Sequence, residues 1–95
     1  MPAYLIARVK VHDYEAYKAY ALESKKAIDA FGGKILTRGG ATEVIEGNDS
    51  SNRVVIVEFK DMSTAKAWYA SEQYQKARQI RQPVSDATFM IVEST

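Results

Sequence analysis

The segment from Ala65 to Arg81, AKAWYASEQYQKARQIR, decides how the rest of the chain is interpreted. Its apolar residues recur at helical spacing, but Ser71 interrupts the pattern and can cap a new helix. The sequence therefore predicts one helix before Ser71 and a second, more basic helix after it, which Pro83 ends. The positions expected on the buried stripe are Ala65, Trp68 and Tyr69 before the break, and Tyr74, Ala77, Ile80 and Val84 after it.

Upstream of that segment the chain predicts one strand and one helix. Residues 3–11 (AYLIARVKV) are rich in β-branched and aromatic types, which favour a strand. From Tyr14 to Phe31 the apolar residues recur with a period of about 3.6, which is typical of a helix with one buried face. Asp13 stands where an N-cap is needed, and Gly32-Gly33 supplies a left-handed stop.

Two extended segments separated by turn residues fill the middle of the chain. Residues 34–46 predict a strand, and the Gly39-Gly40 pair within it indicates a bulge. Residues 47–52 (GNDSSN) are the clearest turn cluster. Residues 53–60 (RVVIVEFK) give the strongest strand signal in the sequence, and the two extended segments are expected to form a hairpin.

The order of these elements predicts the fold. Ser63 is expected to cap the broken helix, and residues 87–93 (ATFMIVE) are expected to form the last strand. The result is β-α-β-β-α-β, an α+β ferredoxin-like arrangement with an antiparallel sheet and two helices on one face. No linker, repeat or low-complexity segment divides the chain, so residues 1–95 are expected to form a single domain.

Composition narrows the classes of function. The 95 residues carry 13 basic and 12 acidic side chains, a net charge of +1, which gives no electrostatic footprint for nucleic acid or anionic lipid. No apolar run resembles a signal peptide or approaches the roughly 20 residues that span a bilayer. We therefore expect no nucleic-acid partner, no membrane association and a cytoplasmic location. The absence of cysteine removes disulfides and thiolate metal sites from consideration.

The strands are apolar on both faces. In residues 53–60, Val55 and Val57 point one way while Val54 and Ile56 point the other. Two helices on right-handed crossovers can cover only one face of the sheet, so the other would be an exposed apolar patch. We expect a homodimer that covers it; the alternative is a monomer with an unusually apolar surface.

Several stretches together resemble the family called domain of unknown function 1330. They are YLIARVKVHDYEAYKAY, GGKILTRGGATEVIEG, RVVIVEFKD, AKAWYASEQYQKARQIR and FMIVE, which extend from Tyr4 to Glu93. The more specific elements are Arg38-Gly39-Gly40, Glu46-Gly47 and Trp68-Tyr69-x-Ser71-x-x-Tyr74. The chain departs from the family pattern at Glu72, where proline is expected in many relatives, and in the short loop after Gly47.

The resemblance implies a dimeric α+β barrel, in which two ferredoxin-like sheets face each other. The wider superfamily includes cofactor-free oxygenases, isomerases, dehalogenase-like enzymes, heme-handling proteins and simple binders. Because the family itself has no established reaction, the resemblance implies a fold and an oligomeric state rather than a chemistry.

The broken helix predicts a small-molecule pocket. A break at Ser71 would leave space over the sheet, and aromatic walls with a few polar groups are typical of ligand sites. An arginine at such a site favours a carboxylate or an enolate. The expected lining is Trp68, Tyr69, Tyr74 and Arg81, with Arg38 near the mouth; the alternative is that the aromatic residues only fill the core.

Two charges lie inside otherwise apolar strands. Arg8 shares a strand face with Tyr4 and Ile6, and Glu58 shares one with Ile56. The first and third strands are neighbours in this topology, so Arg8 and Glu58 are expected to pair across them. Such a pair is either a structural or interface contact, or part of the site.

His12 is the only histidine, and its pKa range would suit a general base or a heme ligand. It stands at a strand-to-helix junction, where an exposed polar residue is also ordinary. One histidine without cysteine argues against a zinc or iron site in one chain, and the carboxylates lack EF-hand spacing. We therefore expect no metal and no organic cofactor.

Three functions remain open from the sequence. The first is a cofactor-free enzyme in which arginines stabilise an oxyanion or enolate and a tyrosine or Glu58 handles protons. The second is a non-catalytic binding or stress-related module. The third is a structural dimer without a ligand.

Overall fold

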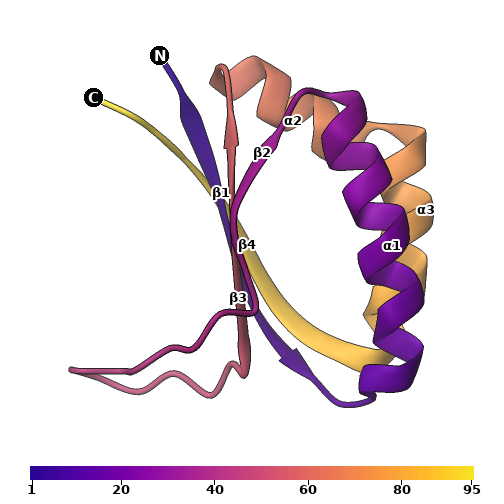
Figure 1. The fold of residues 1–95 in the computed structure, drawn as a ribbon, viewed down its shortest axis with the longest axis vertical. Helices are drawn as coiled ribbons and strands as arrows, with labels where there is room; N and C mark the ends of the chain where they lie inside the picture. The colour runs from indigo at the N-terminus through magenta and orange to yellow at the C-terminus, as the bar shows by residue number, and fades with distance from the viewer.

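The computed structural model describes residues 1–95 and confirms the α+β fold (Figure 1). No helix in it is both long enough and apolar enough to cross a lipid bilayer. The elements in chain order are β1 (Ala3–Val11), α1 (Tyr14–Ala30), β2 (Lys34–Arg38), β3 (Arg53–Phe59), α2 (Met62–Ala70), α3 (Glu72–Arg81), the 3₁₀ turn η1 (Gln82–Val84) and β4 (Ser85–Glu93).

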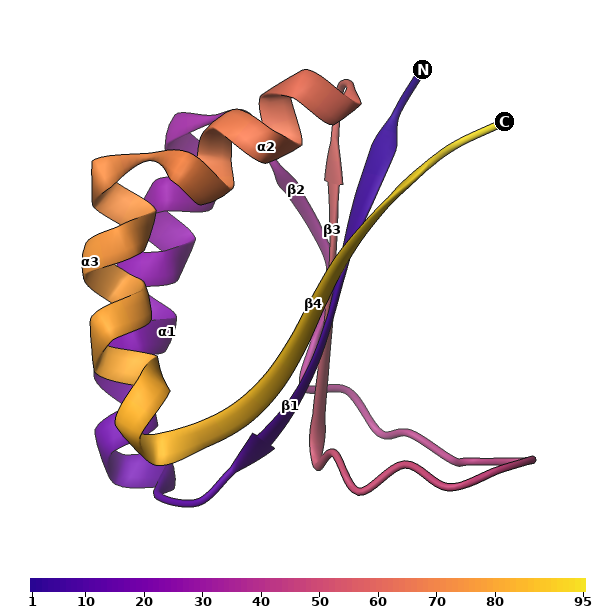
Figure 2. The same ribbon diagram turned by 180° about the vertical axis from the view of Figure 1, so that it is seen from behind.

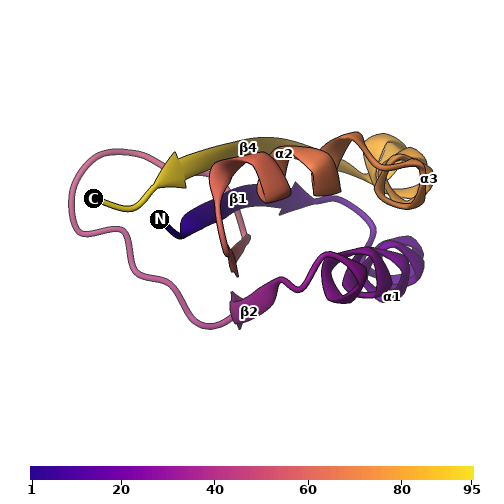
Figure 3. The same cartoon turned by 90° about the horizontal axis from the view of Figure 1, so that it is seen from above.

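The four strands form one antiparallel sheet in the order β2-β3-β1-β4. All helices lie on the same side of it, as Figures 1 and 2 show from opposite directions. Seen from above, α1 and α3 lie next to each other in a layer beside the sheet (Figure 3). This is the ferredoxin-like arrangement, with its second helix broken into α2 and α3.

We call the two sides of the sheet the helix face and the open face. In β1 every second residue from Ala3 to Val11 is buried on the helix face. The intervening residues Tyr4, Ile6 and Arg8 lie on the open face, where no element of the same chain covers them. The buried core, which includes Phe59, therefore lies between the helix face and the helices.

Local capping sets the ends of α1 where the sequence predicts them. The Asp13 carboxylate accepts a hydrogen bond from the Ala16 backbone N–H at 3.2 Å, which satisfies one unpaired donor of the first turn. At the other end Gly32 adopts φ +71°, and the Gly33 N–H donates to the Ile28 carbonyl at 2.9 Å. Glycine is the residue that tolerates this left-handed conformation.

The predicted break at Ser71 is confirmed, and one hydroxyl serves both helices. Ser71 Oγ donates to the Trp68 carbonyl at 2.7 Å, at the end of α2, and accepts from the Tyr74 N–H at 3.1 Å, at the start of α3. The cap expected at Ser63 is wrong. Asp61 caps α2 instead, accepting from the Thr64 N–H at 2.7 Å, because an ionised carboxylate is the stronger acceptor.

The second strand is shorter than predicted, and its bulge lies elsewhere. β2 ends at Arg38, and the register with β3 shifts between Ile35 and Thr37, so that Leu36 is the extra residue. The expected bulge at Gly39-Gly40 is wrong, because Gly39 (φ +76°) instead turns the chain out of the sheet. The shift places Arg38 opposite Val55, on the helix face.

The chain from Gly39 to Asn52, which we call the arm, has no helix or strand. It projects from the sheet on the side away from the helices (Figure 2). The predicted hairpin of residues 34–46 with 53–60 is therefore confirmed only for the short pairing of β2 with β3.

The double cap at Ser71 gives a testable expectation. Ser71→Ala should lower the free energy of unfolding by about 1 kcal/mol, because the Tyr74 N–H loses its acceptor. Urea denaturation measures the change. Ser50→Ala is the matched control, since Ser50 is exposed on the arm and caps no helix. Equal stability of the two variants would show that the cap at Ser71 contributes nothing.

Candidate functional site

A small cavity lies between α1 and the helix face of the sheet, with a volume of about 30 Å³. Its wall is mostly apolar and includes Trp68 and Phe89. The polar side chains that reach it are Tyr17, Tyr20, Ser24, Lys25, Arg38 and Arg53, and no acidic residue lines it. Since one buried water needs about 10–15 Å³, the cavity has room for about two.

Arg53 enters this cavity from the first position of β3. Its guanidinium carbon lies 5.3 Å from the centre of the Tyr17 ring, a cation–π contact. The Arg53 Nε donor is buried without a hydrogen-bond partner, and the side chain makes no ion pair. A β-carbon at position 39 would lie 2.7 Å from Arg53 Nη1, so Gly39 is what leaves room for the guanidinium.

Arg81, from the last turn of α3, is 7% exposed and lies next to the same cluster. Its guanidinium carbon is 4.5 Å from the centre of the Phe89 ring and 5.7 Å from that of Tyr20. Its Nε is also buried without a partner. Aromatic rings rather than carboxylates therefore hold both Arg53 and Arg81, which leaves two positive charges uncompensated.

The tyrosines around these arginines are held in their neutral form. Burial, and next the neighbouring Tyr20, raise the pKa of Tyr17 to about 12. Burial and the same neighbour also raise the pKa of Tyr74, whose hydroxyl lies 3.1 Å from that of Tyr20. Tyr17 and Tyr74 are therefore hydrogen-bonding groups at neutral pH and not bases.

The cavity expected at the helix break is absent, because aromatic rings fill that space. Trp68 and Tyr74 are both fully buried, and their ring centres lie 4.3 Å apart. Of the predicted lining residues, Trp68 and Arg38 reach the cavity beneath α1, whereas Tyr69, Tyr74 and Arg81 do not. The alternative that the aromatic residues fill the core describes Trp68 and Tyr74 best.

Tyr69 and Arg81 instead line a groove on the outer side of α3, with a volume of about 400 Å³. Arg78 stacks on Tyr69 there, with its guanidinium carbon 5.9 Å from the ring centre. Asp86 also lines this groove, so it offers both signs of charge. It is a less selective surface for an anion than the cavity beneath α1.

The predicted pair of Arg8 with Glu58 does not form. Arg8 lies opposite Val54 in the β1–β3 register, whereas Glu58 lies opposite Tyr4, four residues along the strand. Arg8 Nη1 instead lies 3.7 Å from Asp49 Oδ2 of the arm. Arg8 and Glu58 both lie on the open face, so neither can act in the cavity on the helix face.

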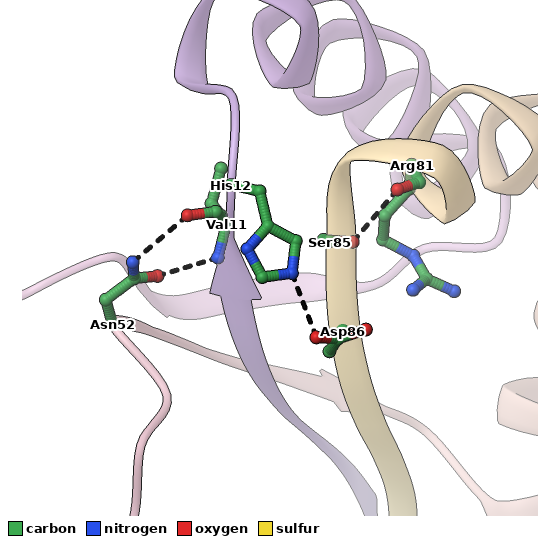
Figure 4. A network of polar contacts seen from close by, with 6 residues as sticks. All are labelled: Val11, His12, Asn52, Arg81, Ser85 and Asp86. Carbon is green, nitrogen blue, oxygen red and sulfur yellow. Dashed lines mark hydrogen bonds and ion pairs between the residues drawn. The ribbon is translucent and has the colours of Figure 1, made fainter.

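His12 lies outside the cavity, at the end of β1. Its Nε2 is 2.9 Å from Asp86 Oδ2 in an exposed contact, beside the pair of hydrogen bonds that joins Asn52 to Val11 (Figure 4). This arrangement connects the ends of β1 and β4. No group of three or more histidine, cysteine, aspartate or glutamate side chains converges as a metal site would require.

Solved structures of other proteins share this fold at low sequence identity. A protein of unknown function from Rhodopseudomonas palustris shares the fold with a TM-score of 0.80 at 19% identity, over 99% of this chain and 82% of that one. A dimeric ferredoxin-like protein of unknown function from Jannaschia sp. CCS1 is similar with a TM-score of 0.72 at 10% identity, over 99% of this chain and 100% of that one.

SnoaB, a cofactor-independent oxygenase from Streptomyces nogalater, is similar with a TM-score of 0.72 at 12% identity, over 99% of this chain and 93% of that one. Residues 2–95 match the family described as domain of unknown function 1330, and the chain belongs to that family. No curated protein matches it.

Sequence reasoning missed Arg53, Tyr17 and Tyr20 as cavity residues. A signal was present, because Arg53 shares a strand face with Val55, and the two tyrosines lie three residues apart on the buried stripe of α1. The sequence does not predict how α1 is rotated about its own axis, and this rotation brings the buried stripe over the start of β3.

The raised tyrosine pKa values predict how stability depends on pH. Tyr17 binds its proton more tightly in the folded state, where its pKa is about 12, than at the ordinary value of 10.0. Its contribution to stability is therefore complete below pH 10 and is lost as the pH rises through 12. Denaturant unfolding across that range should show a decline that Tyr17→Phe reduces. Tyr14→Phe, at a half-exposed position, should not change the slope.

Proposed function

We propose that this protein is a homodimer that binds a small organic anion in the cavity beneath α1. The observation that carries the proposal is that Arg38 and Arg53 reach this cavity without an ion-pair partner and that no carboxylate lines it. Lys25 also lines the cavity, but its Nζ is paired with Asp29 Oδ2 at 2.7 Å. A carboxylate or enolate would satisfy the guanidinium donors with charge-assisted hydrogen bonds. The surrounding aromatic rings suit an aromatic or otherwise planar ligand.

Binding must widen the cavity, because ligand sites usually measure about 300–1,000 Å³. The arginines are the parts that can move. Arg38 is exposed at the end of β2, and Arg53 is held mainly by its stacking on Tyr17. A ligand ring that takes the place of the Arg53 guanidinium over Tyr17 would open space and keep the arginine as its counter-ion.

The open face supports the homodimer. Met90 and Val92 of β4 are 48% and 44% exposed, and Ile6 and Ile56 lie beside them in the sheet, half-buried. A contiguous apolar surface of this kind is typical of an interface. The similar Jannaschia protein is dimeric, and its sheet has the same ferredoxin-like fold. Two open faces packed together would form the α+β barrel.

A cofactor-free reaction is the second candidate, favoured by the likeness to the cofactor-independent oxygenase SnoaB. In such a reaction the arginines would stabilise an enolate of the bound molecule. The candidate base Glu58 lies on the other side of the sheet, and Tyr17 and Tyr74 keep their protons. Binding without turnover is therefore the function that the chain's own residues support best.

Binding can be tested with benzoate and its uncharged analogue benzamide. Benzoate should quench the fluorescence of Trp68, the only tryptophan, and benzamide should bind far more weakly. Arg53→Met should raise the dissociation constant for benzoate roughly tenfold or more, because the variant loses hydrogen bonds to a charged group and each such bond usually changes affinity by about that factor. Arg78→Met, in the outer groove, is the matched control. Equal binding of the two compounds, or an effect at Arg78 alone, would contradict the proposal.

The dimer can be tested by placing a charge on the open face. Light scattering of the unmodified protein should give twice the chain mass of 10.6 kDa. Ile56→Asp should produce a monomer, because an unpaired carboxylate would be buried between the sheets. Leu22→Asp is the control, since Leu22 is 67% exposed on α1. A monomeric unmodified protein would refute the homodimer.

A further inference from the structure

The arm, Gly39–Asn52, exposes apolar side chains on an unpaired backbone. Ile45 is 92% exposed and Val44 is 52% exposed. No backbone–backbone hydrogen bond involves residues 40–51. An exposed pair of β-branched residues in an extended, unpaired segment is well suited to pack against another protein surface.

Hydrogen bonds hold the base of the arm, whereas its tip makes no backbone–backbone hydrogen bond. The Asn52 amide accepts from the Val11 N–H at 2.9 Å and donates to the Val11 carbonyl at 3.2 Å, as Figure 4 shows. The Asn52 backbone N–H donates to the Val9 carbonyl at 3.0 Å, and Asp49 lies near Arg8. These contacts fix the base of the arm against β1 and direct the tip away from the open face (Figure 1).

The length of the arm exceeds the spacing of two packed sheets. Each of its limbs has about six or seven residues, which span roughly 20 Å when extended. Two sheets that pack face to face lie only about 10 Å apart. If a second copy covers the open face, as proposed above, the tip passes the sheet of that copy and comes level with its helices.

An apolar groove lies at the edge of the sheet on that level, between α2 and the edge strand β4. Its volume is about 570 Å³, and it is lined by Leu5, Met62, Lys66, Tyr69, Phe89 and Ile91. Five of these six residues are apolar or aromatic, and Lys66 is the one charge. The groove is on the helix side of the sheet, so the arm of the same chain, which leaves on the opposite side, does not reach it.

The tip of the arm complements this groove. It offers Val44 and Ile45 for the apolar wall, and the flanking Glu43 and Glu46 for Lys66. The whole arm carries three carboxylates and no lysine or arginine. The outer edge of β4 is unpaired in the sheet, so it can also accept the unpaired backbone of the arm as an added strand.

We propose that the arm of each protomer docks by its tip, Val44–Glu46, into the groove between α2 and β4 of a second copy of the chain. This inference rests on the homodimer proposed above. It has a consequence for the ligand site, because Leu5 and Phe89 line both the groove and the cavity beneath α1. The docked tip would therefore contact two side chains that also form the wall of the cavity.

Disulfide trapping tests the docking directly, because the chain has no cysteine of its own. The double variant Ile45→Cys/Lys66→Cys should form a covalent dimer on mild oxidation, since the tip of one copy meets α2 of the other. The matched control is Ile45→Cys/Leu22→Cys, whose second cysteine is also at an exposed position, on α1. A yield of covalent dimer no greater than in the control, or than in Ile45→Cys alone, would overturn the proposal.

Dissociation of the dimer gives a second, independent measurement. Ile45→Asp should raise the dimer dissociation constant at least about tenfold, as loss of a central apolar anchor does. Ser50→Asp, near the base of the arm, should have little effect. If Ile45→Asp changes nothing while Ile56→Asp gives a monomer, the open-face dimer stands and the docked arm is refuted. If the unmodified protein is a monomer, both are refuted.

Discussion

The packing of Trp68 against Tyr74 is the contact on which the rest of the structure depends. The two rings lie 4.3 Å apart and come from opposite sides of the break at Ser71. Trp68 also packs on Phe59 of β3, with ring centres 5.5 Å apart, and the Tyr74 hydroxyl meets that of Tyr20 on α1. One aromatic cluster thereby ties α2, α3, α1 and the sheet together, and it fixes the height of α1 above β3.

This cluster also explains how positive charge is tolerated inside a chain of low net charge. Arg53 and Arg81 are sheltered by Tyr17, Tyr20 and Phe89, whose ring faces attract cations without neutralising them. A carboxylate partner would have cancelled these charges. Ring contacts do not cancel them, and the Nε donors of Arg53, which lines the cavity, and of Arg81, which lies beside it, have no hydrogen-bond partner in the chain.

The sequence predicted the features that depend on a few neighbouring residues. The break at Ser71, the cap at Asp13 and the glycine stop of α1 follow from local hydrogen bonding, and all three are confirmed. The order of the strands and helices along the chain also predicted the antiparallel ferredoxin-like sheet.

The errors concern distances across the sheet. Arg8 and Glu58 share the open face, as their alternation predicts, but face alone does not fix register, and the strand pairing separates them by four residues. Likewise, the bulge at Leu36 brings Arg38 to the helix face, but no glycine lies at that position to indicate a bulge from the sequence. The site could be predicted as far as Trp68 and Arg38, whereas Arg53 depends on how α1 sits over β3.

The sheet places the cavity and the exposed apolar surface on opposite faces, whereas the sequence analysis put Arg8 and Glu58 among the residues of the ligand site. Its helix face carries the arginines and the cavity, and its open face carries the apolar surface together with Arg8 and Glu58. The edge strand β4 contributes to both, because Phe89 touches the cavity while Met90, next to it, points to the open face. Alternation along a strand sends neighbouring side chains to opposite faces, so a partner that shifts β4 also shifts the wall of the cavity. Ligand affinity and dimer affinity are then linked by necessity: if the dimer closes the cavity around an anion, the anion must stabilise the dimer by the same free energy.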